Sequence, residues 1–112
     1  MFDRVTKFIG ENDFEKIKRA TVTVIGLGGV GGYAVECLVR SGVGKIIIVD
    51  YDKVDITNIN RQIISTISNI DEYKTQEWEK RIKLINPDVE VVSLNMKLDL
   101  FNIDELLFCF RP

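Results

Sequence analysis

Three glycines in the first third of the chain have the spacing that phosphate-binding turns require. Gly26, Gly28 and Gly31 follow the β-branched run from Val22 to Ile25 in the pattern G-x-G-x-x-G. In such a turn the first glycine allows a tight bend, the second lets the backbone approach a phosphate, and the third lets the next helix pack closely. Free N–H groups at the start of that helix then face the anion. The pattern predicts nucleotide-phosphate binding, although glycine-rich turns also occur for structural reasons alone.

An acidic residue follows this turn at the distance expected for ribose recognition. Asp50 ends the apolar run that starts at Lys45. Its distance from the glycine turn is close to the spacing of about 20 residues that is typical of a ribose-binding acid. A carboxylate at this place accepts hydrogen bonds from ribose hydroxyls, whereas the alternative is a helix cap or an ordinary loop acid. Up to this point the residues fit a nicotinamide dinucleotide and an adenine mononucleotide equally well.

The polar segment after the second strand distinguishes these two ligands. Asn58, Arg61 and Gln62 are expected at the rim of the sheet, and Lys74 adds a second positive charge. A guanidinium can hold phosphate oxygens through two parallel hydrogen bonds. Displacement at phosphorus needs cations around a terminal phosphate, whereas hydride transfer does not. The segment therefore favours ATP, with solvated surface charges as the alternative role for Arg61 and Lys74.

These residues would meet on a parallel sheet, where the carboxyl ends of neighbouring strands share one edge. Buried β-branched runs alternate with helical apolar spacing, which predicts strand–helix–strand units with right-handed crossovers. We expect an α/β fold with a Rossmann-like parallel sheet in strand order 3-2-1 and helices on both faces. The predicted strands are 21–26, 45–50 and 89–94, and the predicted helices are 12–20, 29–41, 68–86 and 102–110.

Apolar residues at helical spacing mark the helix faces that should enter the core. The two cysteines, Cys37 and Cys109, have neither a metal-ligand spacing nor a disulfide pattern and sit among apolar neighbours. Both are therefore expected to be buried free thiols. The predicted inner faces are Val30, Ala34, Cys37 and Leu38 in helix 29–41, and Tyr73, Trp78, Ile82 and Ile85 in helix 68–86.

Length and composition limit the class of protein. The 112 residues allow one domain at most, and 46% hydrophobic with 29% charged residues is typical of a globular chain. A net charge of −2 argues against a general nucleic-acid-binding surface. The first residues lack the apolar core of a signal peptide, and no apolar run reaches membrane-spanning length. We therefore expect a cytoplasmic protein without a membrane partner.

Five motifs occur in order and cover essentially the whole chain. They are Gly26-x-Gly28-Gly29-Val30-Gly31, Arg40-Ser41-Gly42-Val43-Gly44, Val49-Asp50-x-Asp52-x-Val54, Asn58-x-Asn60-Arg61-Gln62 and Ile85-Asn86-Pro87. Together they resemble the superfamily of ubiquitin-activating-like adenylating enzymes (the ThiF, MoeB and HesA group). With Phe2-x-Arg4 and Ile9-Gly10, they are most similar to the bacterial tRNA threonylcarbamoyladenosine dehydratases.

The resemblance implies an ATP site whose residues match the family's motifs. Asp50 would hold the ribose, and the polar segment with Lys74 would hold and polarise the triphosphate. Arg4 matches an arginine that relatives insert into the partner subunit's site, which implies a homodimer. The implied catalytic residues are Arg61, Lys74 and, across the dimer, Arg4; the implied nucleotide-binding residues are Gly26, Gly28, Gly29, Gly31, Asp50, Asp52, Asn58 and Gln62.

In this superfamily ATP activates a carboxylate, which a nucleophile then attacks. In the dehydratase branch the carboxylate is on the threonyl group of a modified tRNA adenosine, and a nitrogen of the same group closes a ring with overall loss of water. A sulfur-carrier adenylyltransferase, with a diglycine-tailed carrier protein as partner, stays open as an alternative, and so does a non-catalytic nucleotide-binding module. Nicotinamide-dependent oxidoreduction would leave the segment from Asn58 to Gln62 unexplained.

Two features depart from the family pattern. Relatives have a glycine near the start of the Lys74 helix, where this chain carries Asp71 and Glu72, and these acids would weaken the pull of Lys74 on phosphate. Relatives also continue into a strand with a magnesium-binding aspartate and a substrate-binding second half. We therefore expect no metal ligand in this segment, a Mg²⁺ ligand downstream of residue 112, and a single domain that is the amino-terminal part of a longer enzyme. Strand 21–26 would then keep an unpaired edge, which invites pairing with another chain.

Overall fold

The computed structural model describes residues 10–97, in which strands and helices alternate as predicted for an α/β fold. Arg4, Cys109 and the predicted helix 102–110 lie outside the described residues. The elements are helices α2 (Glu11–Arg19), α3 (Gly29–Arg40) and α4 (Lys74–Ile85), strands β1 (Thr21–Ile25), β2 (Lys45–Asp50) and β3 (Glu90–Asn95), and the short 3₁₀ helices η1 (Ile56–Asn58) and η2 (Ile67–Asn69).

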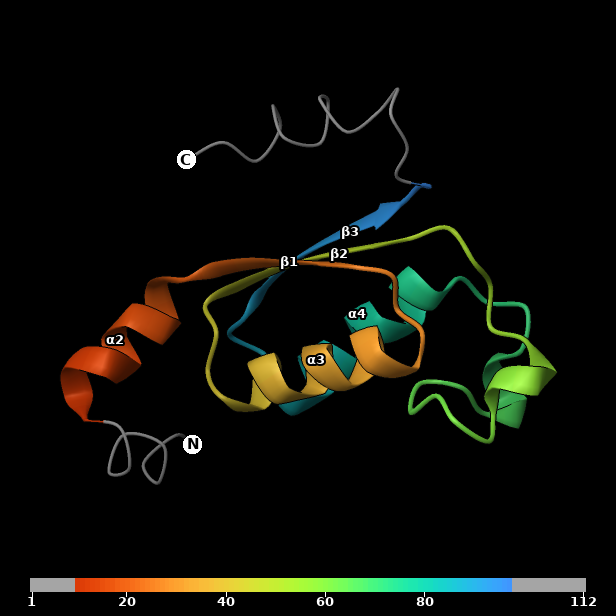
Figure 1. Ribbon diagram of the computed structural model, residues 1–112, viewed down its shortest axis with the longest axis horizontal. Coiled ribbons are helices and arrows are strands. Elements are labelled where there is room, and N and C mark those ends of the chain that lie inside the picture. Colours follow the sequence, from red (N-terminus) through yellow and green to blue (C-terminus); the bar gives the residue numbers. More distant parts are fainter. Residues whose placement is uncertain (1–9, 98–112) are drawn as a thin grey trace.

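The three strands form one parallel sheet with β2 between β1 and β3 (Figure 1). This is the predicted order 3-2-1, and each strand agrees with its predicted range to within one residue. In the register, Thr21 lies opposite Lys45, and Lys45 in turn lies opposite Glu90. All three strands run the same way, so their carboxyl ends meet at one edge of the sheet.

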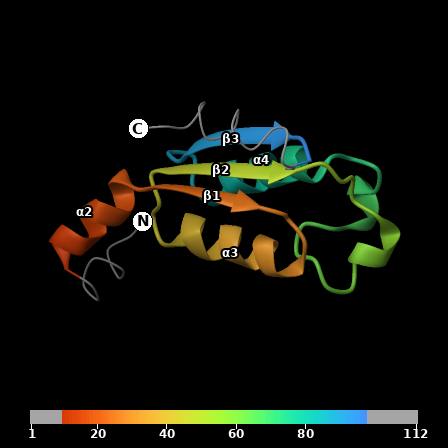
Figure 2. The same cartoon turned by 45° about the horizontal axis from the view of Figure 1, so that its top comes forward.

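Helices α3 and α4 lie on the same face of the sheet and form the main core with it (Figure 2). Within the described part of the chain no helix covers the opposite face; the predicted helix 102–110 lies outside the described residues. Ile47 and Val49 of β2 are buried on that opposite face with partly buried neighbours from β3. The fully buried residues of the main core include Leu27, Val35, Val39, Ile46, Ile48, Trp78 and Ile82.

The buried face of α3 differs from the predicted one. Val35 and Val39 are fully buried, whereas Val30 is 88% exposed and Cys37 is an exposed free thiol. A Cβ at Gly32 would lie 3.0 Å from the Trp78 ring, so the absence of a side chain there lets α4 approach this side of α3. The helix face is therefore rotated by about one residue, about 100° on a helix, and the prediction of a buried Cys37 was wrong.

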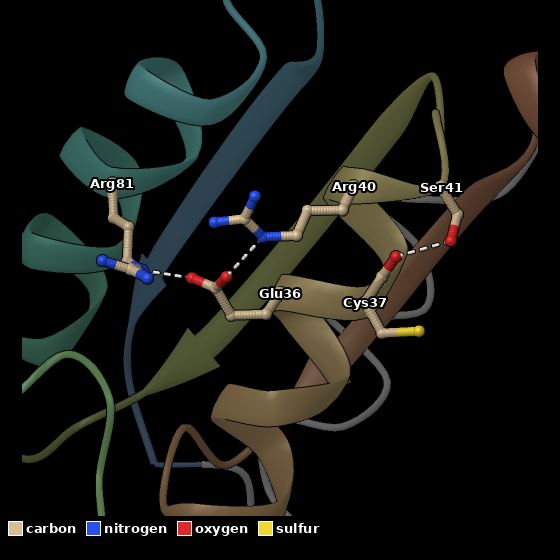
Figure 3. A network of polar contacts seen from close by, with 5 residues as sticks. All are labelled: Glu36, Cys37, Arg40, Ser41 and Arg81. Carbon is tan, nitrogen blue, oxygen red and sulfur yellow. Dashed lines mark hydrogen bonds and ion pairs between the residues drawn. The ribbon is translucent and has the colours of Figure 1, made fainter. Parts of the chain in front are cut away.

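A nearly buried glutamate joins the two core helices. Glu36 of α3 accepts hydrogen bonds from the Nε of Arg81 in α4 and, at 2.9 Å, from the Nε of Arg40 (Figure 3). Burial alone would raise the pKa of the Glu36 carboxyl, but the hydrogen bonds and charges of Arg81 and Arg40 outweigh it. The pKa therefore lies below its ordinary value of 4.5.

Helix α4 begins at Lys74 and not near residue 68, where the sequence suggested a helix start. Residues 67–69 form the separate turn η2, and Asp71 then has a positive φ of 72°. A left-handed residue cannot continue a right-handed helix, so the chain restarts after it. Of the predicted inner residues, Trp78 and Ile82 are fully buried, and Tyr73 and Ile85 are half-buried.

Strand β1 is covered on one face only, although its β-branched sequence predicted burial on both. Val22 and Val24 pack at the margin of the main core, whereas Thr21, Thr23 and Ile25 are exposed. The reason is that, among the described residues, no helix covers the face of the sheet to which these three side chains point.

Helix α2 leads into β1 at the amino end of the sheet (Figure 1). A Cβ at Gly44 would lie 1.8 Å from the Lys18 carbonyl oxygen, so only glycine permits this close contact between the end of α2 and the start of β2. None of the helices in residues 10–97 has the length and apolar content needed to span a bilayer.

Candidate nucleotide-binding site

A cavity of about 500 Å³ lies at the shared carboxyl edge of the sheet. Its volume falls within the range of about 300–1,000 Å³ that is typical of small-molecule sites. The glycine turn, the ends of all three strands, the polar segment and the start of α4 contribute to it. It is lined by Ile25, Gly26, Gly28, Val49, Asp50, Tyr51, Asp52, Asn58, Arg61, Gln62, Lys74, Met96 and Lys97.

The glycine turn uses its three motif glycines for different purposes. Gly26 has a positive φ of 85°, which bends the chain out of β1. A Cβ at Gly31 would lie 1.8 Å from the Gly26 carbonyl oxygen, so α3 packs against the turn only because position 31 lacks a side chain. Gly28 lines the cavity and has nothing closer than the Gln62 amide nitrogen at 4.0 Å from such a Cβ. Gly29, the first residue of α3, and Gly31 do not line the cavity.

Asp50 connects the end of β2 to the glycine turn. Its side chain is 8% exposed, and Oδ2 accepts a hydrogen bond from the Leu27 N–H at 2.6 Å. Oδ1 accepts from the Asp52 N–H at 2.7 Å. The carboxylate thus organises the turn, a part of its role that the sequence reading did not foresee. Each carboxylate oxygen has further lone pairs, so Asp50 can still accept from a ribose hydroxyl.

The polar segment presents amide and guanidinium donors to the cavity from a rigid turn. Asn58 is 7% exposed, and its Oδ1 accepts from the Asp55 N–H at 2.9 Å, which leaves the amide nitrogen available as a donor. Hydrogen bonds from Thr57, together with the positive charge of Lys74, lower the pKa of the exposed Asp55 carboxyl. The exposed Arg61 donates from Nη1 to the Thr57 carbonyl oxygen at 2.9 Å, which holds its guanidinium at the rim.

Lys74 is a largely buried lysine at the cavity wall. It is the first residue of α4, its backbone N–H donates to the Asp52 carbonyl oxygen, and it is only 5% exposed. Within the described residues its ammonium forms no hydrogen bond or ion pair with a side chain. Asp71 and Glu72, the acids expected to weaken its charge, are exposed and form no ion pair with it.

The structure adds cavity residues that the sequence reading missed. Tyr51 directly follows Asp50, and Met96 and Lys97 directly follow β3. The Lys97 ammonium lies 5.7 Å from the centre of the Tyr51 ring, which is within cation–π range. The signal that could have found them is general: residues that follow a parallel strand lie at the ligand-binding edge of the sheet.

No group of three or more histidine, cysteine or acidic side chains in residues 10–97 is arranged to hold a metal ion. The described residues line the cavity with cations, amides and two carboxylates, those of Asp50 and Asp52. This donor set suits a phosphorylated ligand with hydroxyl groups.

Comparisons with known proteins agree with this geometry. Residues 2–110 match the ThiF family. The chain is 47% identical over 95 residues to a tRNA threonylcarbamoyladenosine dehydratase of Bacillus subtilis, covering 85% of this chain and 37% of that protein. It is 35% identical over 99 residues to a sulfur carrier protein adenylyltransferase of Thermus thermophilus, covering 88% of this chain and 36% of that protein.

A solved structure shares the same fold. The tRNA N6-threonylcarbamoyladenosine dehydratase of E. coli, in complex with ATP, superposes with a TM-score of 0.93 at 33% identity. The similarity covers 96% of this chain and 44% of that chain. The present chain spans about a third of the length of the curated relatives it matches. The extent of the family match, together with the glycine turn and the polar segment in register, shows that the chain belongs to the ThiF family.

Proposed function

We propose that this chain is the ATP-binding part of an enzyme that activates a carboxylate. The observation that carries the proposal is the position of Lys74, a 5% exposed lysine that lines the cavity and forms no ion pair within the described residues. The phosphates of a nucleotide in the cavity would supply an anionic partner for this ammonium. The ATP complex of the E. coli dehydratase, which has the same fold, supports this choice of ligand.

The proposal gives each group of cavity residues a role. The Gly26–Gly31 turn, with Gly28 and Gly29 at its centre, takes the phosphates, and Asp50 with its neighbour Asp52 takes the ribose. Asn58 and Gln62 donate to phosphate oxygens. Arg61 and Lys74 stabilise the negative charge that builds up when a phosphorus atom is attacked.

The substrate that we propose is the threonyl carboxylate of threonylcarbamoyladenosine in tRNA. A carboxylate oxygen attacks a phosphorus of ATP and displaces pyrophosphate or ADP. A nitrogen of the same group then attacks the activated carbonyl carbon, and the bond to the phosphoryl oxygen breaks. The sum is ring closure with loss of one water and cleavage of one ATP. The 47% identity to the Bacillus dehydratase supports this substrate over others.

A second candidate is adenylation of a sulfur-carrier protein. The Thermus adenylyltransferase, at 35% identity over most of this chain, is the observation that favours it. Its carboxylate would be the carboxyl terminus of the carrier, and the partner would be a protein rather than tRNA.

We further propose that the enzyme is a cytoplasmic homodimer and that Mg²⁺ accompanies ATP. The outer edge of β1, which no other strand in residues 10–97 pairs with, supports self-association, because an unpaired strand edge pairs readily. Arg4 would then act in the partner subunit's site. A ligand for Mg²⁺ is proposed downstream of residue 112, as the resemblance to the adenylating superfamily implies.

Calorimetric titration of the chain with ATP and with NAD⁺ tests the nucleotide. Preferential binding of NAD⁺ would refute the proposal. For the substrate, the gene that encodes this chain should restore the dehydrated nucleoside in tRNA of a strain that lacks the dehydratase, as a product lighter by one water in mass spectrometry. Adenylation of a diglycine-tailed carrier instead of tRNA dehydration would favour the second candidate.

A further inference from the structure

Three buried polar atoms, one of them on the cavity residue Gln62, have no hydrogen-bond partner within the described residues. They are Gln62 Oε1, Ser65 Oγ and Trp78 Nε1. The residues that carry them are 7%, 5% and 0% exposed. Buried polar atoms in native proteins are almost always paired, with protein or with ordered water, so three such atoms in one small domain require an explanation.

Two of the three side chains, those of Gln62 and Trp78, lie beside one turn of α3, and Ser65 is bonded to the backbone of Gln62. The Gln62 amide nitrogen lies 4.0 Å from the position of a Cβ on Gly28. Trp78 Cε2, the ring atom bonded to Nε1, lies 3.7 Å from the equivalent position on Gly32. Gly28 and Gly32 are one turn apart, joined by a 2.8 Å hydrogen bond. The Ser65 N–H donates to the Gln62 carbonyl oxygen at 3.0 Å, so Ser65 closes a turn onto Gln62.

The chemistry of the three atoms is complementary. Trp78 Nε1 can only donate, Gln62 Oε1 can only accept, and the Ser65 hydroxyl can do both. A buried water makes about three hydrogen bonds and is stable where two to four polar groups surround it. One water could therefore serve all three atoms. It would accept from the indole, donate to the amide oxygen and exchange a hydrogen bond with the hydroxyl.

Such a water would also decide which end of the Gln62 amide faces the ligand. The oxygen is enclosed in the interior, whereas the nitrogen lies beside Gly28, a residue of the cavity wall. Phosphate oxygens accept hydrogen bonds, so only the amide nitrogen can bind them. If the amide were flipped, its oxygen would face the phosphate oxygens, and two hydrogen-bond acceptors would repel each other.

We propose that Ser65 and Trp78 are positioning residues that hold the Gln62 amide, through one shared buried water, with its nitrogen toward the nucleotide phosphates. The inference rests on the proposed ATP function. It adds two residues that do not line the cavity and that act only through Gln62. A donor fixed before binding strengthens the bound state, because no reorientation is needed when the ligand arrives.

The experiment is a double-mutant cycle on ATP affinity, measured by calorimetry. Ser65→Ala should weaken ATP binding about three- to tenfold in the parent chain. In a Gln62→Ala background the same change should have less than about a twofold effect, because the amide it positions is gone. Ser68→Ala is the matched control, since Ser68 is exposed and its hydroxyl pairs with Thr66. An equal loss in both backgrounds, or no loss in the parent, would overturn the inference.

A second measurement needs no substitution at the site. Trp78 is the only tryptophan, so its indole N–H gives a single nitrogen-15 resonance. That proton should show a cross-peak to a long-lived bound water in the parent chain, and the cross-peak should disappear in Ser65→Ala. Absence of the cross-peak in the parent would overturn the inference even if a variant failed to fold. Failure of the proposed function has a different signature, namely that the parent chain does not bind ATP.

Discussion

The backbone N–H of Leu27 donates to Oδ2 of Asp50 at 2.6 Å, which joins the glycine turn to the end of the central strand. Leu27 is fully buried, and Asp50 is 8% exposed. The Asp50 carboxylate, which is proposed to bind ribose, therefore also holds the glycine turn in place. Loss of this carboxylate should disturb both the turn and the ligand.

Asp50→Ala should weaken ATP binding by about 1.5–3 kcal/mol, the value of hydrogen bonds to a charged group. Asp50→Asn keeps one side-chain acceptor and should lose less. Calorimetry gives the affinities, and urea unfolding of both variants reports the separate cost to the turn. Unchanged ATP affinity in Asp50→Ala would mean that the ribose is held elsewhere.

Lys74→Ala should reduce ATP affinity by about tenfold or more, since a hydrogen bond to a charged group contributes about 1.5–3 kcal/mol. The loss should shrink from ATP to ADP to AMP, because Lys74 is assigned to the triphosphate. Lys53→Ala is the matched control: Lys53 is exposed, does not line the cavity and lies 5.1 Å from the centre of the Tyr73 ring. A similar loss for both lysines would indicate only general attraction of anions.

Two glycine variants distinguish a glycine that is required for packing, Gly31, from one that is proposed to contact the ligand, Gly28. Gly31→Ala places a methyl group 1.8 Å from the Gly26 carbonyl oxygen, so it should destabilise the chain by at least about 1–3 kcal/mol. Gly28→Ala meets no protein atom closer than 4.0 Å, so the fold should persist while ATP affinity falls. Urea unfolding and calorimetry on the pair test this. Full ATP affinity in Gly28→Ala would place the phosphates away from the turn.

The contact between α3 and α4 should depend on pH through Glu36. Its folded-state pKa is lowered, so the stabilisation is fully present above the ordinary value of 4.5 and is lost as the pH falls through the folded-state value. Glu36→Gln should lower the free energy of unfolding by about 1–3 kcal/mol at pH 7, with a smaller deficit under acid conditions. Glu15→Gln, which breaks an exposed pair with Arg19, is the control and should change stability by less than about 1 kcal/mol. If the loss in free energy of unfolding of Glu36→Gln did not change with pH, the ion pairs of Glu36 would not be its cause.

Among the described residues no strand pairs with the outer edge of β1, and we predict that this edge lets the chain self-associate. Light scattering across a range of concentrations should give a mass above the 12.8 kDa of one chain. Thr23→Lys puts a charge on the exposed face of this edge strand and should shift the mass toward the monomer. Ser68→Lys adds the same charge on an exposed turn away from the edge and should not. A mass near 12.8 kDa throughout would rule out the dimer and leave Arg4 without its proposed role.

Local patterns in the sequence were sufficient for the strands and for eight of the residues that line the cavity. The β-branched runs before Gly26 and Asp50 predicted parallel strands to within one residue, because strand propensity and turn glycines act over a few neighbouring residues. The same topology rule gathers eight of the predicted site residues into one cavity: Gly26, Gly28, Asp50, Asp52, Asn58, Arg61, Gln62 and Lys74. Their binding and catalytic roles remain predictions.

Only the tertiary structure decided how the helices face and what each polar group contacts. Gly32 lets Trp78 approach α3, and this contact turns Cys37 outward against its apolar neighbours in sequence. Because Asp71 has a left-handed backbone conformation, α4 begins only at Lys74. Lys74 thereby becomes part of the cavity wall. Helical periodicity cannot foresee such outcomes, because they depend on the shape and charge of segments distant in sequence. The chain alone determined which groups meet at the sheet edge, and packing determined which of them are buried, paired or left for a ligand.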